Sequence, residues 1–486
     1  MKLFSRLEKS RSFWFLLIIS VVFFFLRWPS LFEPYWYGDE GIYQAVGMLI
    51  NDGAKLYSGA WDNKPPLLYV LYALFNSDQY ALRILSLFFG LFSVWAFYFV
   101  VKRILPKSKY AAFISTSLYA FAFGTRLIEG NIANAENFML LPILASAYII
   151  VSGDYIKKAW HFRFHLLSGF LMSLAFLTKI VAVFDFMALL FFILIDHEKD
   201  LKDKFGNRTL PFIAGFALPV VSILGYFFLT NNFKDAINGF LFSNVGYVGY
   251  GNEFIIPQGL LYIKAGLLLG FLGFVFWKRK KIPRNVLFTT VWFAFSLFSA
   301  FFAQRPYTHY LIMLLPSFCL MVGAIIEEKK TRIVLIIFLV IGYLAIVNIF
   351  NLKRDKLINH YTNLIAFCSD KKDASSYQAF FDGNTPRDYD LARYIKAHTT
   401  KDESIFLWGN NAQIYKLAEK TPIMRYTVAY HITNYPTGLS EMENAIRTKE
   451  PKLIVVMPNV PEFPMKLINY EEKIDIRGVK IYEKVF

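Results

Sequence analysis

The stretch FWFLLIISVVFFFLRW, residues 13–28, is an uninterrupted apolar run close to the length of a membrane-spanning helix, and YWYGDEGIY, residues 35–43, follows it closely. The second stretch carries two adjacent carboxylates, Asp39 and Glu40. A carboxylate pair costs little in water and is expensive inside hydrocarbon. The two stretches together therefore predict a first span that ends just before an acidic pair at the membrane–water boundary.

Apolar residues dominate the remaining chain as well. They make up 56% of the 486 residues and occur in long blocks, which predicts a polytopic α-helical membrane protein. The net charge of +16 could indicate nucleic acid, but Lys and Arg fall mostly in short clusters between the apolar blocks. Such clusters are typical of cytoplasmic loops that face anionic headgroups. We therefore expect membrane lipids and no nucleic acid as partners.

The apolar blocks predict about eleven spans. The first run lacks a small-residue cleavage site and is interpreted as an uncleaved span. The segment PPLLYVLYALF, residues 65–75, is too short to cross a bilayer, so we expect a helix at the interface. The candidate spans are residues 13–28, 82–100, 110–126, 137–151, 166–179, 181–195, 211–230, 258–277, 285–303, 308–327 and 332–350.

Positive charge defines the predicted orientation. By the positive-inside rule, the basic segments lie in the cytoplasm and the intervening loops lie outside the plasma membrane. The first loop, residues 29–81, and the C-terminal segment then share the outer side. The predicted cytoplasmic segments are the N-terminus and residues 102–109, 157–165, 196–208, 278–284 and 327–332.

Hydropathy falls after Asn351, which divides the chain into a transmembrane domain, residues 1–350, and an extracytoplasmic α/β domain, residues 351–486. Helical spacing and buried-strand patterns alternate in the second domain, and its last segment alternates like an edge strand. We see no inverted repeat of the kind that many transporters have. The predicted elements of this domain are a helix at 387–399, buried strands at 404–409 and 452–458, and an edge strand at 479–486.

Asp39 and Glu40 are the first candidates for chemistry. A carboxylate at the outer mouth of a helix bundle can take a proton from an acceptor, although an ordinary solvated loop acid fits the local sequence too. The flanking aromatic residues 35–37 fit an interfacial belt. Such a position suits a substrate with a lipid tail and a polar head.

Four basic residues could form a cationic patch at the depth of a lipid phosphate. Each of them could equally be an interfacial anchor whose charge reaches the headgroups. Lys179 interrupts an apolar stretch, and a lysine within a membrane is a candidate functional residue by default. The members of this predicted patch are Lys64, Lys179, Arg305 and His309.

Glu129 and Glu136 form a second acidic region on the predicted outer face. They could orient an acceptor or hold a divalent cation, while a helix N-terminus alone would explain Glu136. The histidines show no zinc spacing, and the chain has neither a Walker loop nor a dinucleotide fingerprint. A soluble nucleotide donor is therefore disfavoured.

These residues together resemble the C-type glycosyltransferases, specifically the bacterial branch related to protein O-mannosyltransferases and to the aminoarabinose transferase of lipid A. The resemblance covers about residues 13–350. It rests on Asp39-Glu40, Lys64-Pro65-Pro66-Leu67, Leu177-Thr178-Lys179, and His309-Tyr310 ahead of a span that contains Pro316. The C-terminal domain, with Trp408-Gly409 followed by Tyr415, also looks like this branch.

The resemblance implies an enzyme that transfers a sugar, with inversion, from a polyprenyl-phosphate carrier to a lipid, glycan or protein acceptor. It assigns Asp39 as the catalytic base, Glu40 as its neighbour and Lys64 as the lysine near the donor phosphate. Asn63 stands where the lipid A branch has Glu, and Glu136 is followed by Asn137, so both motifs depart from the family pattern. The predicted reaction requires no cofactor, because cations can stabilise the leaving phosphate.

Two other classes of function remain open on the sequence. A transporter or flippase of a lipid-linked sugar should carry polar groups at the membrane midplane, whereas the candidate residues crowd the predicted outer face. If the protein were a receptor or scaffold that works through its C-terminal segment, substitution of Asp39 would not affect its function. Replacing Asp39 therefore separates the enzyme from both alternatives.

Overall fold

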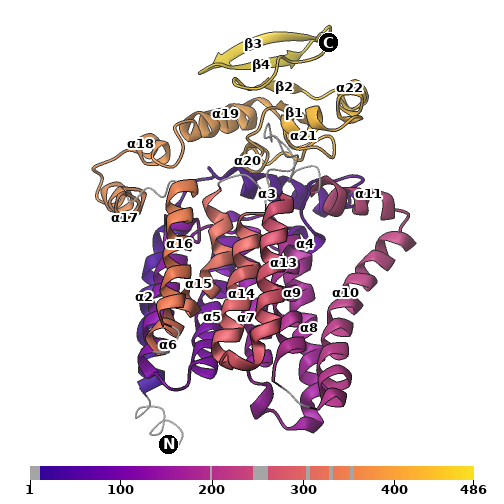
Figure 1. The fold of residues 1–486 in the computed structure, drawn as a ribbon. Coiled ribbons are helices and arrows are strands. Elements are labelled where there is room, and N and C mark those ends of the chain that lie inside the picture. Colours follow the sequence, from indigo (N-terminus) through magenta and orange to yellow (C-terminus); the bar gives the residue numbers. More distant parts are fainter. Residues whose placement is uncertain are drawn as a thin grey trace, which may run out of the picture. The chain divides into compact units, whose positions relative to one another are not determined.

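The computed structural model describes residues 11–197, 200–244, 261–302, 307–327, 332–350 and 355–485, and most of them are helical (Figure 1). The chain divides into two compact units. We call Met1–Ser30, Arg83–Tyr226 and Asn244–His360 the helical unit. Leu31–Leu82, Phe227–Ser243 and Tyr361–Phe486 form the second, mixed unit. The sequence predicted one boundary near residue 350, whereas the structure groups most of the first predicted loop with the C-terminal segment.

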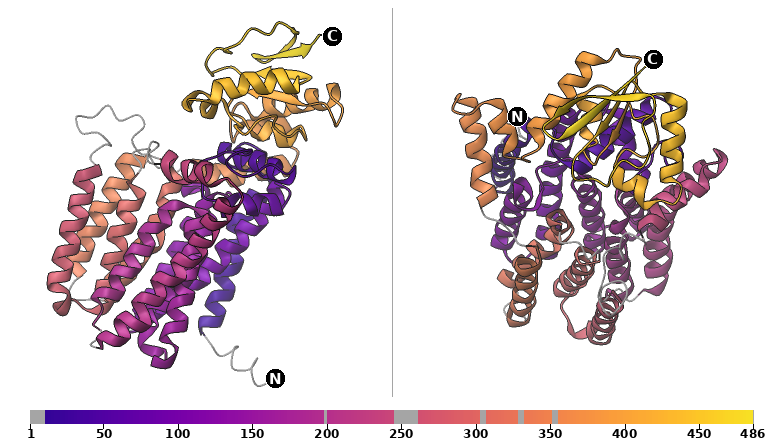
Figure 2. Two further views of the ribbon diagram at one scale, coloured as in Figure 1. Left: turned by 90° about the vertical axis from the view of Figure 1, so that its right-hand side faces the viewer. Right: turned by 90° about the horizontal axis from the view of Figure 1, so that it is seen from above.

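The helical unit is a bundle whose main helices lie side by side (Figures 1 and 2). Every predicted span overlaps one of these helices, although residues 258–260 and 303 of two spans lie outside the described residues. The helices are α2 (Arg11–Arg27), α5 (Gln79–Ile104), α6 (Lys109–Gly124), α7 (Ala135–Val151), α8 (His161–Thr178), α9 (Val183–Ile195), α10 (Leu210–Leu229), α13 (Leu261–Lys278), α14 (Arg284–Ala300), α15 (Leu311–Glu327) and α16 (Arg332–Phe350).

Several helices are apolar enough to cross a membrane. Within the described residues, five segments have both the length and the hydropathy of a span. Four shorter apolar helices accompany them, so the chain is a multi-pass membrane protein, while the number of spans stays a prediction. The five segments are Arg11–Phe32, Gln79–Ile104, Asp203–Leu229, Leu261–Lys281 and Thr308–Glu327.

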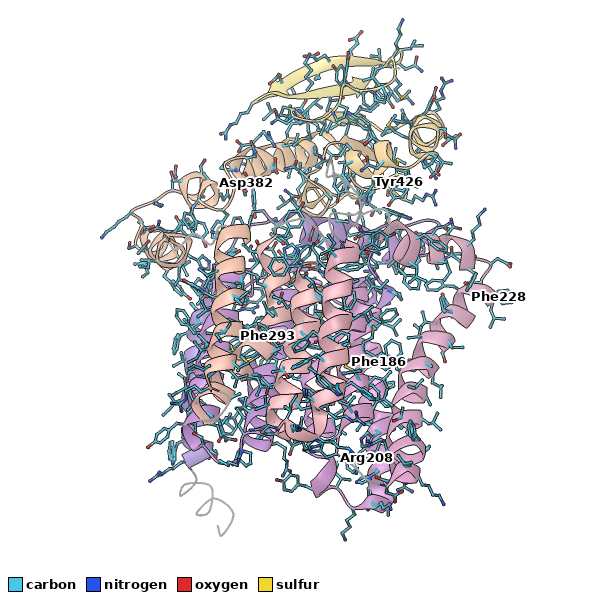
Figure 3. All side chains as sticks on the ribbon, viewed as in Figure 1. Phe186, Arg208, Phe228, Phe293, Asp382 and Tyr426 are labelled. Carbon is cyan, nitrogen blue, oxygen red and sulfur yellow. The ribbon has the colours of Figure 1, made fainter. Side chains whose placement is uncertain are left out.

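Aromatic rings and close backbone contacts hold the bundle together. The ring of Phe186 on α9 stacks on those of Phe212 and Phe216 on α10, with centroid distances of 4.9 and 4.1 Å. Figure 3 shows such side chains filling the space between the helices. A Cβ on Gly169 of α8 would lie 2.0 Å from the Phe212 carbonyl oxygen. Only glycine therefore permits this approach of α8 to α10.

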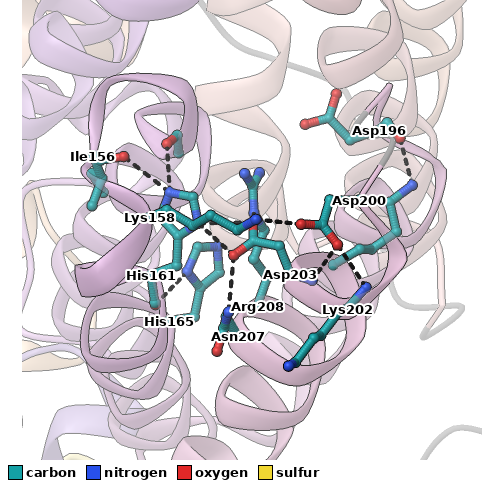
Figure 4. Close-up of polar contacts among 12 residues, drawn as sticks. Ile156, Lys158, His161, His165, Asp196, Asp200, Lys202, Asp203, Asn207 and Arg208 are labelled. Atoms are coloured by element: carbon teal, nitrogen blue, oxygen red, sulfur yellow. Dashed lines mark hydrogen bonds and ion pairs between the residues drawn. The ribbon is translucent and has the colours of Figure 1, made fainter.

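Hydrogen bonds and ion pairs connect the predicted cytoplasmic loops at one end of the helical unit. Arg284 donates to the Asp196 carboxylate at 3.0 Å. Nearby in sequence, the π-helix η6 (Asp203–Thr209) carries a buried carboxylate, Asp203, which contacts His161 at 2.8 Å and accepts from Arg208 at 2.8 Å (Figure 4). This network joins α8 to α10 and includes none of the predicted site residues.

The mixed unit contains the first-loop helices and the C-terminal α/β elements. The expected short helix at residues 65–75 is present as α4, which begins at Pro66 where proline needs no backbone donor. The helices of this unit are α3 (Gly38–Asn51), α4 (Pro66–Leu74), α11 (Phe233–Ile237), α18 (Ala374–Ala379), α19 (Thr385–His398), α20 (Gln413–Leu417), α21 (Ala429–Asn434) and α22 (Gly438–Lys449), and α17 (Asp355–Cys368) leads into it.

The C-terminal sheet has four strands in the order β1-β2-β4-β3. Strand β1 (Ile405–Trp408) pairs in parallel with β2 (Leu453–Val456), and β4 (Val479–Lys484) pairs antiparallel with both β2 and β3 (Tyr470–Ile476). The predicted helix and both buried strands are confirmed. The strand predicted at 479–486 is confirmed as β4, although residue 486 lies outside the described residues. Its predicted position at the edge is wrong, because the polar strand β3 precedes a turn at Arg477 and Gly478, both with positive φ, and pairs with the outer side of β4.

Helix α3 packs closely against α20 of the C-terminal segment. A Cβ on Gly41 would lie 2.6 Å from the backbone nitrogen of Gln413, so glycine is required at this contact. The aromatic flank of the acidic pair also contacts this segment, because the ring of Trp36 lies 6.0 Å from that of Phe381. Trp36 therefore packs against protein on one side, and its predicted place in an interfacial belt stays a prediction.

Candidate functional site

The predicted site residues that are described fall into two groups, one in each unit. Asp39 and Glu40 belong to the mixed unit and lie in the first turn of α3, where the helix N-terminus favours negative charge. Asp39 is partly exposed, whereas Glu40 is 2% exposed. In the described part of the chain, no ion pair involves the Asp39 carboxylate. The pair thus begins a helix within the predicted first loop.

Lys64 lies just before α4, in the same unit. Its backbone N–H donates to the hydroxyl oxygen of Tyr69 at 3.0 Å, and its carbonyl accepts from the hydroxyl of Tyr57 at 2.9 Å. Both tyrosine side chains are fully buried. The Lys64 ammonium donates to the amide oxygen of Asn63 at 2.6 Å. The lysine therefore projects from a backbone that is held on both sides.

The side chain of Lys64 lies close to helix α3. The Lys64 ammonium lies 5.8 Å from the centre of the Tyr43 ring. Tyr43 follows Asp39 by four residues, which places both on the same side of the helix. The predicted phosphate-binding lysine therefore lies beside Tyr43, one helical turn from the predicted base.

The sequence did not predict a role for Asp62, Tyr69 or His431. The Asp62 side chain is buried and accepts from the Tyr69 hydroxyl at 2.6 Å, and its other oxygen lies 3.7 Å from Nε2 of His431. His431 comes from α21, and its ring meets that of Trp61 edge-on at 4.8 Å. A polar loop next to Lys64 gave no signal of burial, because the burial depends on residues far away in the sequence.

Burial lowers the pKa of His431 to about 4, because the attraction of Asp62 offsets only part of the lost hydration and Lys64 repels the charged ring. As the pH falls from the ordinary value of 6.5 towards 4, the unfolded chain binds a proton that the folded chain excludes. Folding stability should then fall by about 3 kcal/mol over this range.

We expect the melting temperature of the purified protein to drop more between pH 7 and 4.5 than that of His431→Gln. Differential scanning fluorimetry in detergent measures this difference. His398→Gln, at an exposed histidine of the same unit, is the control and should follow the wild type. Parallel pH profiles for wild type and His431→Gln would contradict the assignment.

The second group lies in the helical unit. Lys179 ends α8, as the predicted helix break requires, and its ammonium forms an ion pair with the buried carboxylate of Glu136. The capping residue Asn134 starts α7 just ahead of Glu136. The Lys179 ammonium also lies 5.1 Å from the ring centre of Tyr310. The sequence suggested phosphate binding for Lys179 and placed no partner beside it.

His309 joins Glu136 to Glu129. Its Nδ1 lies 3.1 Å from a Glu129 oxygen and its Nε2 lies 3.7 Å from Glu136. Glu129 follows the short helix η2 (Arg126–Ile128) and has a left-handed backbone with φ 60°, which is uncommon outside glycine. Thr308 also donates to the Glu129 carboxylate. Four of the predicted residues, Lys179, Glu136, His309 and Glu129, thus form one polar network.

Arg305 lies outside the described residues. Among the residues that the structure describes, no group of three His, Cys, Asp or Glu side chains is arranged to hold a metal ion. The carboxylates of Glu129 and Glu136 face His309 and Lys179 instead. The predicted role of these acids in orienting an acceptor stays a prediction.

Comparisons with known proteins show which proteins this chain resembles. Residues 64–226 match the family model of the dolichyl-phosphate-mannose-protein mannosyltransferases. The matched part contains Lys64, Glu129, Glu136 and Lys179, whereas Asp39 and His309 lie outside it. A comparison with curated protein sequences gives no significant match.

Two solved structures share the fold. ArnT from Cupriavidus metallidurans, bound to undecaprenyl phosphate, matches with a TM-score of 0.61 and 13% identity over 97% of this chain and 98% of that chain. The oligosaccharyltransferase AglB from Archaeoglobus fulgidus, in complex with an inhibitory peptide and a dolichol-phosphate, matches with a TM-score of 0.50 and 13% identity over 93% and 70%. The predicted resemblance to the C-type glycosyltransferases is therefore confirmed.

Proposed function

We propose that this protein is a membrane glycosyltransferase that moves a sugar from a polyprenyl-phosphate carrier to an acceptor on the outer face of the membrane. The observation that carries the proposal is the place of Lys64, whose ammonium lies 5.8 Å from the centre of the Tyr43 ring, one helical turn along α3 from Asp39. A base beside a cation is what attack on a sugar phosphate needs. The family match and the carrier lipids bound to ArnT and AglB support this choice of donor.

In the proposed reaction, Asp39 takes the proton of the acceptor hydroxyl or amine. The acceptor atom forms a bond to the anomeric carbon while the bond from that carbon to the phosphate oxygen breaks. The electron pair of the broken bond leaves with the polyprenyl phosphate, so the configuration at the anomeric carbon inverts. Lys64 stabilises the negative charge that develops on this leaving group.

Lys179, Arg305 and His309 remain proposed contributors to phosphate binding, and Glu129 and Glu136 remain proposed to orient the acceptor. Lys64 is proposed as the main cation. Its ammonium donates to a neutral amide oxygen, whereas Lys179 is paired with the carboxylate of Glu136.

The test is sugar transfer in proteoliposomes supplied with undecaprenyl-phosphate mannose, glucose or galactose and with cell-envelope lipids as acceptors. The wild-type protein should release undecaprenyl phosphate, which mass spectrometry detects. The turnover should be about 100-fold lower in Lys64→Met. Lys55→Met is the matched control, because Lys55 lies in the same unit, is exposed and donates to the Thr230 carbonyl at 3.2 Å.

Two results would contradict the proposal. Movement of the intact donor across the bilayer without release of the carrier phosphate would identify a flippase. Equal turnover in Lys64→Met and Lys55→Met would remove Lys64 from the reaction.

A further inference from the structure

A chain of buried polar contacts connects the C-terminal segment to the backbone of Lys64. The Lys64 N–H donates to the Tyr69 hydroxyl at 3.0 Å, and that hydroxyl donates to Asp62 at 2.6 Å. The second oxygen of Asp62 lies 3.7 Å from Nε2 of His431. Tyr69, Asp62 and His431 are 0%, 2% and 5% exposed. Water therefore has little access to any member of this chain.

The other side of the Lys64 peptide is equally constrained. Its carbonyl accepts from the Tyr57 hydroxyl at 2.9 Å, and Pro65 restricts the backbone of the residue before it. With both its peptide groups held, Lys64 can move its ammonium only through its own side-chain torsions. The buried chain of contacts therefore determines the position from which the Lys64 side chain projects.

His431 is itself held by the C-terminal sheet. Helix α21 starts at Ala429, whose N–H donates at 2.8 Å to the carbonyl of Gly409, directly after β1. The Trp61 N–H donates at 2.9 Å to the Arg425 carbonyl, which ties the segment before Asp62 to the same part of the chain. The C-terminal segment thus provides a rigid base for the contacts that end at Lys64.

We propose that His431, Asp62 and Tyr69 are positioning residues that aim Lys64 at the donor phosphate. This inference rests on the proposed function, because it assumes that Lys64 binds that phosphate. It assigns the C-terminal segment a part in donor affinity, although none of the three residues needs to touch the substrate. The substrate class concerned is a polyprenyl phosphate, recognised by its charged head.

The protonation states suit this role. Burial, reinforced by the charge of Asp62, raises the pKa of Tyr69 well above its ordinary value, so the hydroxyl keeps the proton that it donates. The lowered pKa of His431 keeps this ring neutral near pH 7, and the charged groups that act on it are Asp62 and Lys64. The Asp62 carboxylate therefore accepts from a neutral tyrosine hydroxyl and faces a neutral imidazole ring.

The experiment measures the affinity of the purified full-length protein for undecaprenyl phosphate, by native mass spectrometry or by competition with a fluorescent analogue. We expect Tyr69→Phe to weaken binding about tenfold, because it removes one hydroxyl that accepts from Lys64 and donates to Asp62. Tyr415→Phe is the matched control. Tyr415 is as buried, lies in the same unit and accepts from the Leu407 N–H at 3.1 Å.

A second pair of variants addresses His431. His431→Phe leaves Asp62 without the ring nitrogen and should weaken binding, whereas His431→Gln keeps a side-chain donor and should recover part of the affinity. Melting temperatures identify any variant that fails to fold, and Tyr69→Phe, which keeps the ring, is the milder change. Full affinity in both Tyr69→Phe and His431→Phe would overturn the inference.

The double variant Lys64→Met/Tyr69→Phe distinguishes positioning from general support of the fold. If Tyr69 acts through Lys64, the double variant should bind as weakly as Lys64→Met alone. Independent effects that multiply would show that Tyr69 does not act through Lys64. Unchanged binding in Lys64→Met itself would instead refute the proposed phosphate contact, and the positioning role with it.

Discussion

Asp39→Asn is expected to lower the rate of sugar transfer about 1,000-fold while the protein remains folded and binds undecaprenyl phosphate. The amide has nearly the shape of the carboxylate but cannot accept the acceptor proton, and loss of a general base typically costs 100- to 10,000-fold. Asp39 is partly exposed in the first turn of α3, so the substitution buries no new polar group. Transfer from the carrier in proteoliposomes and binding of the carrier are the two measurements.

Two variants on the same helix control this experiment. Asp52→Asn changes an exposed carboxylate at the C-terminal end of α3 and should leave transfer unchanged. Glu40→Gln changes the buried neighbour and tests whether the second acid shares the role. Near wild-type transfer by Asp39→Asn would exclude this residue as the base and would favour the transporter or scaffold alternatives.

The second large effect is expected at the ion pair of Lys179 and Glu136, whose side chains are 8% and 0% exposed. Lys179→Met should lower the free energy of unfolding by about 3–5 kcal/mol, because it leaves a buried carboxylate without its main counter-charge. Glu136→Gln/Lys179→Met should recover much of the loss, because neither charge remains. Unfolding of the purified protein in denaturant, followed by tryptophan fluorescence, measures both changes.

The role of His309 provides the check on this prediction. Its Nε2 lies 3.7 Å from Glu136, so a protonated ring could replace the lysine charge. If Lys179→Met is as stable as the wild type, the histidine carries the pairing and the assignment of Lys179 is wrong. The matched control is Lys158→Met, which removes a cation from an exposed ion pair with Asp200 and should change stability by less than about 1 kcal/mol.

Hydrophobic runs were sufficient to predict the helices of the helical unit. A helix that faces lipid must be apolar along its length, so its position is visible in any window of the sequence. The break at Lys179 was also visible, because a charged residue interrupts an apolar stretch. The partner of Lys179 was not, since Glu136 precedes it by 43 residues and only packing of α7 against α8 brings them together.

The mixed unit was harder to predict because its segments are far apart in the sequence. The hydrophobic pattern located β1 and β2, whose residues are buried, and missed β3, whose residues are mostly exposed. The burial of Asp62 depends on His431, which lies in the C-terminal segment. A polar stretch that becomes buried through a distant partner carries no local signal, so sequence reasoning identified Lys64 and missed the residues that hold it.

The close contact of Gly41 with Gln413 has a consequence for how this protein can be recombined with others. A chimera that joins a foreign C-terminal segment at residue 360 would place a different surface against α3. This helix tolerates no added methyl group at Gly41. The natural block for exchange is discontinuous and comprises Leu31–Leu82, Phe227–Ser243 and Tyr361–Phe486. The two units of this protein are defined by packing, and a single crossover in the gene does not separate them.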